Sequence, residues 1–148
     1  MKFVTIDKAF LTNNIHSFLN LIKNWKYSNW QEENFFYDLP SKWNFSFAIY
    51  EQNTLLGFCF ASGKISNTYY IHLLFISDAL RGKDIGSKMI GYAREIALKN
   101  KINKIELRCP ESNVKAIDFY KKNKFEIISK LTDETSGSES DYYLQLKI

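Results

Sequence analysis

Apolar residues recur with a helical period near the N-terminus of the chain. Residues 12–25 carry them three or four positions apart, which predicts one helix. Thr12 or Asn13 is suited to cap its start. Ser28 or Asn29 is suited to begin a second short helix, which Pro40 stops near residue 37. The apolar positions of the first helix are Ile15, Phe18, Leu19, Ile22 and Trp25.

Shorter apolar runs predict the strands of a sheet. Residues 45–50 and 55–62 flank a short polar turn, which is typical of a hairpin. Residues 69–76 are apolar on both faces, so they belong at the centre of a sheet. Two further strands, joined by a polar loop, are predicted at residues 125–131 and 142–146.

The middle of the chain has the pattern of a parallel βαβ unit. The strand at 69–76 is followed by a helix from Ile85 with one apolar stripe, and then by a short strand at 104–108. Such a unit normally makes a right-handed parallel crossover. Another helix is predicted at 113–123. We therefore expect a mixed α/β fold in which strands outnumber helices, in one domain spanning residues 1–148.

The composition is that of an ordinary globular protein, with 45% apolar and 24% charged residues. Cys59 and Cys109 lie in apolar strand-like runs, which predicts buried thiols in a reducing compartment and no disulfide framework. With His16 and His72 as the two histidines, we expect no metal centre. The N-terminus lacks the apolar core of a signal peptide, and no run is long enough to span a membrane. We therefore expect a cytoplasmic protein without a membrane partner.

Positive charge is concentrated in one stretch of the chain. The formal net charge is +4, and residues 80–104 alone contain seven basic residues against two acidic ones. A charge run is usually a solvated helix face. Here it accompanies a glycine-containing loop at 81–87 that joins a strand to a helix, where backbone N–H groups and the helix dipole favour an anion. A phosphate-bearing ligand is the better explanation.

A second motif follows the next strand and leads into the helix at 113–123. Asn113, Ala116, Ile117 and Tyr120 lie on one face of that helix and should look towards the mouth between the two parallel strands. An amide and a phenol on an apolar face need partners. Taken singly, Asn113 is a good helix cap and Tyr120 a core aromatic with its hydroxyl at the surface.

The two motifs together resemble those of the GCN5-related N-acetyltransferase (GNAT) superfamily, over residues 69–131. The family's first motif has Arg or Gln, two variable residues, Gly, one variable residue, then Gly or Ala. Its second has Asn, Ala three residues later, then an aromatic residue or Leu followed by Tyr. In this chain they stand as Arg81-Gly82-Lys83-Asp84-Ile85-Gly86 and Asn113-Val114-Lys115-Ala116-Ile117-Asp118-Phe119-Tyr120.

The resemblance implies a GNAT-like acyl-CoA N-acyltransferase fold. Its central sheet is mixed but mostly antiparallel, with about six to seven strands, a parallel pair at the centre and about four flanking helices. The implied cosubstrate is acetyl-CoA. Its pyrophosphate would bind the loop's N–H groups, and its pantetheine arm would lie between two strands that splay apart, which end at Ile76 and Arg108. The implied cofactor-binding residues are Phe75, Ile76, Arg81, Gly82, Lys83, Asp84, Ile85, Gly86, Ser87, Asn113 and Tyr120.

Two positions depart from the family pattern. Asp84 stands where the first loop glycine is usual, and its carboxylate could cap or repel at the phosphate site. Asp tolerates the required backbone conformation, so we expect reduced affinity at worst. Lys124 stands where a glycine is usual, and we expect Asn123 to adopt the left-handed conformation that ends the helix.

Amide formation needs a neutral amine and a protonated leaving thiol. The resemblance implies direct attack of a primary amine on acetyl-CoA in a ternary complex, with Tyr120 as the general acid. His72, on the strand that leads to the loop, is the best candidate base. The alternative is that His72 is a hydrogen-bonded residue within the sheet. Glu106, Glu111 or a water chain are other possible proton acceptors, and His16 is expected at the surface.

The acceptor site of the family lies between the first helices and the ends of the central strands. Aromatic side chains with acidic neighbours suit a cationic amine there, although core packing explains most of these aromatics. We prefer a small-molecule amine, with a peptide or protein amine second, and a homodimer is one expected state. A non-catalytic acyl-CoA-binding module is the alternative that Asp84 leaves open. Without a recognition helix we expect no nucleic-acid partner. The residues concerned are Trp25, Tyr27, Trp30, Phe35, Phe36, Tyr37 and Trp43, with Glu32, Glu33 and Asp38.

Overall fold

The computed structural model describes residues 1–80, 82–132 and 140–148. Arg81, which the resemblance assigns to the phosphates, lies outside the described residues, as does most of the polar loop expected before the last strand.

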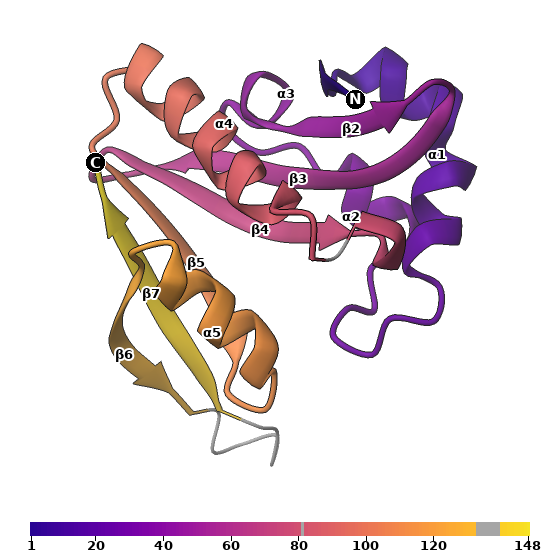
Figure 1. Cartoon of the computed structure of the whole chain (residues 1–148). Coiled ribbons are helices and arrows are strands. Elements are labelled where there is room, and N and C mark those ends of the chain that lie inside the picture. The colour runs from indigo at the N-terminus through magenta and orange to yellow at the C-terminus, as the bar shows by residue number, and fades with distance from the viewer. Residues whose placement is uncertain (81, 133–139) are drawn as a thin grey trace.

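Seven strands form one sheet in the described part of the chain, in the order β1-β2-β3-β4-β5-β7-β6 (Figure 1). Strands β4 and β5 are parallel, and every other neighbouring pair is antiparallel. This is the expected mixed sheet with a parallel pair at its centre. The strands are β1 (Lys2–Thr5), β2 (Phe47–Glu51), β3 (Thr54–Lys64), β4 (Thr68–Ile76), β5 (Lys104–Pro110), β6 (Glu126–Leu131) and β7 (Asp141–Lys147).

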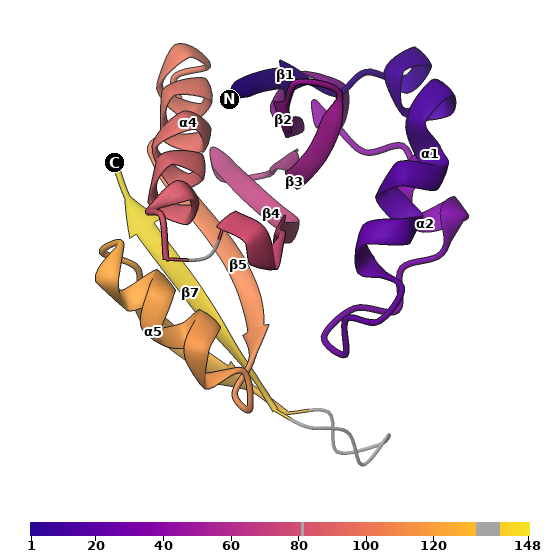
Figure 2. The ribbon, with the colours of Figure 1, turned by 45° about the vertical axis from the view of Figure 1, so that its right-hand side comes forward.

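Helices cover the two faces of the sheet. Figure 2 shows α1 and α2 on one face and α4 and α5 on the other. Each face has its own apolar core: Phe18, Phe35 and Phe58 pack on the first face, and Met89 and Ile117 on the second. The helices are α1 (Lys8–Ile22), α2 (Glu32–Phe36), α3 (Lys42–Phe45), α4 (Ile85–Lys99) and α5 (Val114–Lys122), with a 3₁₀ turn η1 at Asp78–Leu80.

The helix starts near the N-terminus differ from the sequence prediction. Helix α1 begins four residues before Thr12, because Asp7 caps it by accepting a hydrogen bond of 2.7 Å from the Phe10 N–H. Thr12 instead lies within the helix and donates to the Lys8 carbonyl. Helix α2 begins at Glu32, not near Ser28, after a capping box formed by Gln31 and Asn34. Strand β1 and helix α3, four residues each, were too short for their periodicity to predict.

The end of α5 is also a correction. Asn123 has a φ of −91°, and its side chain donates to the Phe119 carbonyl, so it continues the helical turn. The left-handed residue is Lys124, with a φ of 75°. The left-handed conformation therefore falls at the position where the family usually has glycine, and it costs Lys124 backbone strain.

The parallel pairing of β4 and β5 stops halfway along β4. The register runs from Thr68–Lys104 to Ile71–Leu107 and goes no further. In the neighbouring pair, β3 shifts register where Phe60 opposes Leu73 and Ala61 opposes Ile71, which leaves His72 as the extra residue of a β-bulge. The two strands then diverge, as Figure 1 shows.

The bulge also changes which face each side chain of β4 covers. Ile71 belongs to the core under α4, whereas Leu73, two residues later, belongs to the core under α1. In a regular strand both would point to the same face. The second half of β4 is therefore rotated relative to the first half, and no described strand pairs with its β5-facing edge from His72 to Ile76.

Gly57 sets the position of this free segment from the opposite edge. A Cβ at Gly57 would lie 2.8 Å from the Phe75 carbonyl oxygen, which is backbone and cannot turn away.

We expect Gly57→Ala to lower the free energy of unfolding by about 1–3 kcal/mol, measured by urea denaturation. Gly91→Ala is the matched control, because nothing lies within 4 Å of its Cβ on α4. It should stabilise the protein by about 0.5–1 kcal/mol. Equal effects of the two substitutions would contradict the close approach of β3 and β4.

Candidate active site

The loop before α4 presents unpaired backbone donors. Gly82 and Asp84 both have left-handed backbone conformations, with φ values of 80° and 63°. Helix α4 begins directly after Asp84, and no described residue accepts a hydrogen bond from the N–H of Ile85, Gly86 or Ser87. Asp84 makes no side-chain cap, so its carboxylate leaves these donors free. Such a helix start fits a phosphate or pyrophosphate group.

Gly86 brings the start of α4 against the end of β4 and against α5. A Cβ there would lie 2.6 Å from Cε1 of Phe119 and 3.0 Å from Cδ1 of Ile76. The glycine of the first motif is thus packed on the helix that carries the second motif. Tertiary contact joins two motifs that are about thirty residues apart in the sequence.

The free edge of β4 is the neighbouring feature. Phe75 is buried on the α1 face, where its ring packs 5.1 Å from Trp25 and 5.6 Å from Phe58, measured between centroids. Phe75 lies opposite Phe58 of β3 and its carbonyl oxygen lies on the Gly57 side, so its backbone faces β3 while its ring supports the strand. Ile76 is partly buried on the α4 face. Backbone groups of an unpaired strand edge need partners, and an amide-containing arm such as pantetheine can supply them.

Tyr120 lies on α5 and Asn113 caps the start of that helix, beside this gap. Tyr120 is 8% exposed and packs between Phe119 and Phe125, and no described residue is hydrogen-bonded to its hydroxyl. Burial raises the pKa of Tyr120 well above its usual range, with smaller contributions from Cys109 and Cys59. The phenol is therefore protonated at neutral pH. Asn113 caps α5 by accepting a hydrogen bond from the Ala116 N–H at 3.3 Å.

His72 lies on the opposite face of the sheet from Tyr120. Its Nε2 shares a hydrogen bond of 2.6 Å with the Ser62 hydroxyl, and its ring meets that of Tyr70 at 4.8 Å. Burial lowers the pKa of His72 to about 4, helped by the charges of Lys64 and Lys42. His72 is therefore a hydrogen-bonded residue of the sheet that also lines a cavity, and its role as a base stays a prediction.

That cavity has a volume of about 300 Å³. It lies between the α2–α3 segment and β4, on the face that α1 covers. Trp30 and Tyr37 come from the aromatic stretch that the sequence assigned to the acceptor, while none of the three acids predicted there lines the cavity. The lining residues are Trp30, Asn34, Tyr37, Leu39, Lys42 and His72.

Lys42 is the lining residue that sequence reasoning missed. It is 1% exposed, and its Nζ donates to the carbonyls of Phe35 at 2.6 Å and Tyr37 at 2.5 Å. Burial lowers the pKa of Lys42 to about 8, while the Asp38 carboxylate raises it. A lysine in a short polar segment gives no sequence signal of burial, so only the folded chain identifies it.

The other carboxylates considered as bases are already engaged. Both oxygens of Glu106 accept hydrogen bonds of 2.6 Å, one from the Tyr143 hydroxyl and one from the Gln145 amide. Glu111 pairs with Lys130 at 3.0 Å. Within the described residues, no group of three or more His, Cys, Asp and Glu side chains is arranged to hold a metal ion.

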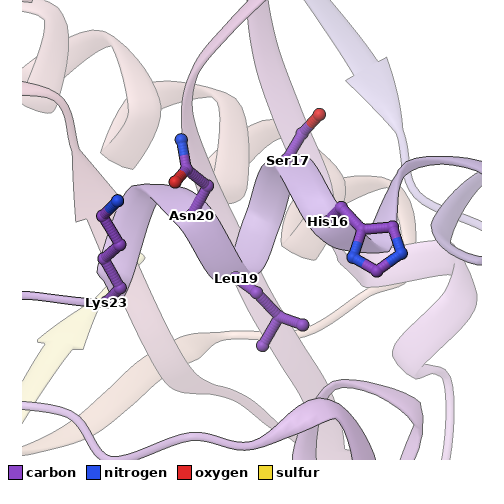
Figure 3. Close-up of a pocket in the computed structure, with 5 residues that line it drawn as sticks. All are labelled: His16, Ser17, Leu19, Asn20 and Lys23. Atoms are coloured by element: carbon purple, nitrogen blue, oxygen red, sulfur yellow. The ribbon is translucent and has the colours of Figure 1, made fainter.

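A second hollow lies on the outer surface of α1 (Figure 3). Its lining residues all come from this one helix and its C-cap residue Lys23, and no group from another element lines it. His16 is exposed there, as expected. The hollow therefore lacks the convergent polar groups of a catalytic site. It is lined by His16, Ser17, Leu19, Asn20 and Lys23.

Taken together, a seven-stranded sheet with an opened parallel pair and a phosphate-type helix start at the opening defines the acyl-CoA N-acyltransferase class. The sequence model of the acetyltransferase (GNAT) family matches residues 15–125. The chain therefore belongs to the GNAT family, which makes it an acetyl-CoA-dependent N-acetyltransferase by class and confirms the predicted family, cosubstrate and fold. No curated protein matches the chain in sequence.

Solved structures agree with this fold over nearly the whole chain. Ard1 from Thermoplasma volcanium has a TM-score of 0.86 at 18% identity, covering 99% of this chain and 97% of that one. The ribosomal-protein-S18-alanine N-acetyltransferase from Escherichia coli has a TM-score of 0.82 at 13% identity, covering 99% and 93%. Naa50 from Arabidopsis thaliana, in complex with the bisubstrate analogue CoA-Ac-MVNAL, has a TM-score of 0.79 at 20% identity, covering 99% and 98%.

The lowered pKa of His72 has a consequence for stability. Well above pH 6.5 the imidazole is neutral in both states. As the pH falls through 6.5 towards about 4, the unfolded chain binds a proton on His72 and the folded chain does not. Acidification through this window should therefore favour unfolding through His72. We expect the stability difference between wild type and His72→Gln, from urea denaturation at several pH values, to shift against wild type as the pH falls. His16→Gln gives the reference for loss of an exposed imidazole, and parallel wild-type and His72→Gln profiles would contradict the shift.

Proposed function

We propose that this protein transfers the acetyl group of acetyl-CoA to the primary amine of a small molecule by direct attack in a ternary complex. The observation that carries the proposal is the juxtaposition at Gly86. It brings the free N–H groups of α4 to the open edge of β4, with the α5 helix of Tyr120 packed against both.

Each of these groups has a role that its environment supports. The N–H groups of Ile85, Gly86 and Ser87 bind the pyrophosphate, and the free edge of β4 orients the pantetheine arm and polarises the thioester carbonyl. When bound, acetyl-CoA supplies an activated acyl carbon. Tyr120, whose phenol is protonated at neutral pH, donates a proton to the departing thiolate. Asn113 holds α5, and therefore Tyr120, in place through its cap.

His72 is the candidate that receives the proton of the amine. It is neutral at physiological pH and lines the cavity next to the free edge of β4. Glu106 and Glu111 are less suited, since neither lines the cavity. A water chain through the cavity can carry the proton onward from His72 to solvent.

The small cavity supports a small acceptor. Its volume of about 300 Å³ lies at the lower end of the range of ligand pockets, which is roughly 300–1,000 Å³. A peptide amine is the second candidate, favoured by the whole-chain similarity to an alanine N-acetyltransferase and to a peptide-analogue complex.

We place the protein in the cytoplasm. Both cysteines are free and buried, which supports the cytoplasm, and no helix in the described ranges is long and apolar enough to cross a membrane. A homodimer stays a prediction.

Tyr120→Phe tests the acid role. Removing the hydroxyl should lower acetyl-CoA-dependent thiol release by roughly 100-fold or more, the usual contribution of a general acid. Affinity for CoA, measured by calorimetry, should stay within a few-fold of wild type. Tyr50→Phe, on β2 and away from α5, is the control and should keep the wild-type rate. A Tyr120→Phe enzyme as fast as wild type would overturn the role. Wild-type protein that binds CoA but releases no thiol with any amine would point to the non-catalytic module.

Asp84→Asn tests the effect of the carboxylate beside the phosphate site. Asn tolerates the left-handed conformation at this position, so the change removes charge without adding strain. Because Asp84 directly precedes the free N–H groups, we expect CoA to bind several-fold tighter, on the order of 1 kcal/mol. Asp118→Asn changes the same charge on the exposed side of α5 and should leave CoA affinity nearly unchanged. Weaker binding by Asp84→Asn would contradict electrostatic repulsion at this position.

A further inference from the structure

The charge of the cavity beside His72 bears on the acceptor, and this inference rests on the proposed function. Among the six lining residues, Lys42 is the group that is ionised at neutral pH, and none is a carboxylate. Glu32 and Glu33 are exposed on α2, outside the lining. Asp38 accepts a hydrogen bond of 2.9 Å from the Trp43 indole. The sequence pattern of aromatics with acids therefore folds into a cavity with the opposite charge.

Lys42 cannot move its charge away from the cavity. Its ammonium is fixed by the carbonyls at the end of α2, which point their negative dipoles at it. Aromatic rings surround it, with the Trp43 centroid at 4.9 Å and the Phe60 centroid at 5.6 Å. The ammonium has almost no contact with solvent, so its field on the cavity is weakly screened.

A second cation stands on β3 near His72. Lys64 holds its Nζ 3.5 Å from the centroid of Tyr70, the residue two positions before His72 on β4. Lys64 is exposed and lies outside the lining of the cavity, and like Lys42 it disfavours a positive charge on His72.

The charged groups on the neighbouring strand β5 are compensated locally. Glu106 on β5 is bonded by Tyr143 and Gln145 of β7 and lies 3.9 Å from Lys104. Arg108 on β5 pairs with Asp141 on β7 at 3.2 Å. None of these four groups lines the cavity. Lys42 is therefore the charged group in the lining itself, while the Asp38 carboxylate, outside the lining, raises the pKa of Lys42.

A positive field has two effects on an amine acceptor. It raises the energy of any second cationic group, and it favours loss of the proton from the reacting ammonium. An α-amino group, with an ordinary pKa of about 7.7–8.0, is neutral to about one third at pH 7.5, whereas a lysine-type amine with a pKa of about 10.4 is neutral to about 0.1%. The difference in the neutral fraction is roughly 250-fold. A weakly basic His72 cannot offset that difference by removing a proton from a strongly basic amine.

We propose that the acceptor is an α-amino compound, such as an amino acid amide or a short peptide, and that the lysine-lined cavity disfavours polyamines, lysine side chains and other strongly basic amines. The bound α-amine loses its proton through His72 or water, attacks the thioester carbon to form the amide bond, and the thiolate that leaves takes a proton from Tyr120.

Two isomeric substrates test this directly. Alanyl-lysine amide acetylated on the lysine side chain offers only its α-amine, whereas the same dipeptide amide acetylated on its N-terminus offers only the ε-amine. We expect at least a 10-fold higher kcat/KM for the α-amine isomer at pH 7.5, measured by CoA release. Equal rates, or preference for the ε-amine isomer, would overturn the inference.

Variants then connect the preference to the field. Lys64→Met keeps most of the side-chain stem over Tyr70 and removes the charge. It should lower the ratio of kcat/KM for the α-amine isomer to kcat/KM for the ε-amine isomer several-fold. Lys99→Met removes an exposed charge at the far end of α4 and should leave the preference unchanged. An unchanged preference in Lys64→Met would exclude the lysine field as its cause and overturn the inference.

Failure of the proposed function has a different signature. If the protein binds no CoA, or releases no thiol with either isomer, the acetyl transfer itself is overturned and the inference with it. Acetylation that favours the ε-amine overturns the acceptor class alone and leaves acetyl transfer standing.

Discussion

The interruption of the β4–β5 ladder after Ile71 is the constraint on which the candidate site depends. A parallel pair at the centre of a sheet normally continues along both strands, because every unpaired backbone group must otherwise find another partner. Here the bulge at His72 rotates the second half of β4, and β5 turns away with β7. Two close contacts fix the position of this open segment of β4. Gly57 on β3 approaches the Phe75 carbonyl oxygen, and Gly86 at the start of α4 packs against Ile76.

Under the proposed function, the same rotation lets the two faces of the sheet serve different parts of one reaction. On the α4 and α5 face, the helix start and Tyr120 lie beside the opening, where the proposal places the phosphates and the leaving thiol. On the α1 and α2 face, His72 and the cavity lie beside the same opening, where it places the amine. Because Ile71 and Leu73 anchor in opposite cores, neither half of β4 can rotate without disturbing the packing of the other.

Lys42 connects the stability of the α2–α3 segment to the chemistry proposed for the cavity. Burying an ammonium is costly, and the carbonyls of Phe35 and Tyr37 offset part of that cost. The interaction closes the C-terminal end of a five-residue helix that has little stability by itself. The charge that holds this segment in place is therefore also the charge that an acceptor would meet.

The sequence by itself determined the order and type of the longer elements, and it identified both motifs. Their signals are local, since apolar periodicity and glycine-containing loops depend on neighbours along the chain. Local signals also gave wrong positions for two helix ends. The cap of α1 is Asp7 and not Thr12, and the left-handed residue after α5 is Lys124 and not Asn123. Tertiary structure alone decided that Gly86 packs on Phe119, that pairing stops at Ile71, and that Lys42 is buried beside His72. These features arise between segments distant in sequence, and the charge of a cavity depends on which side chains meet there.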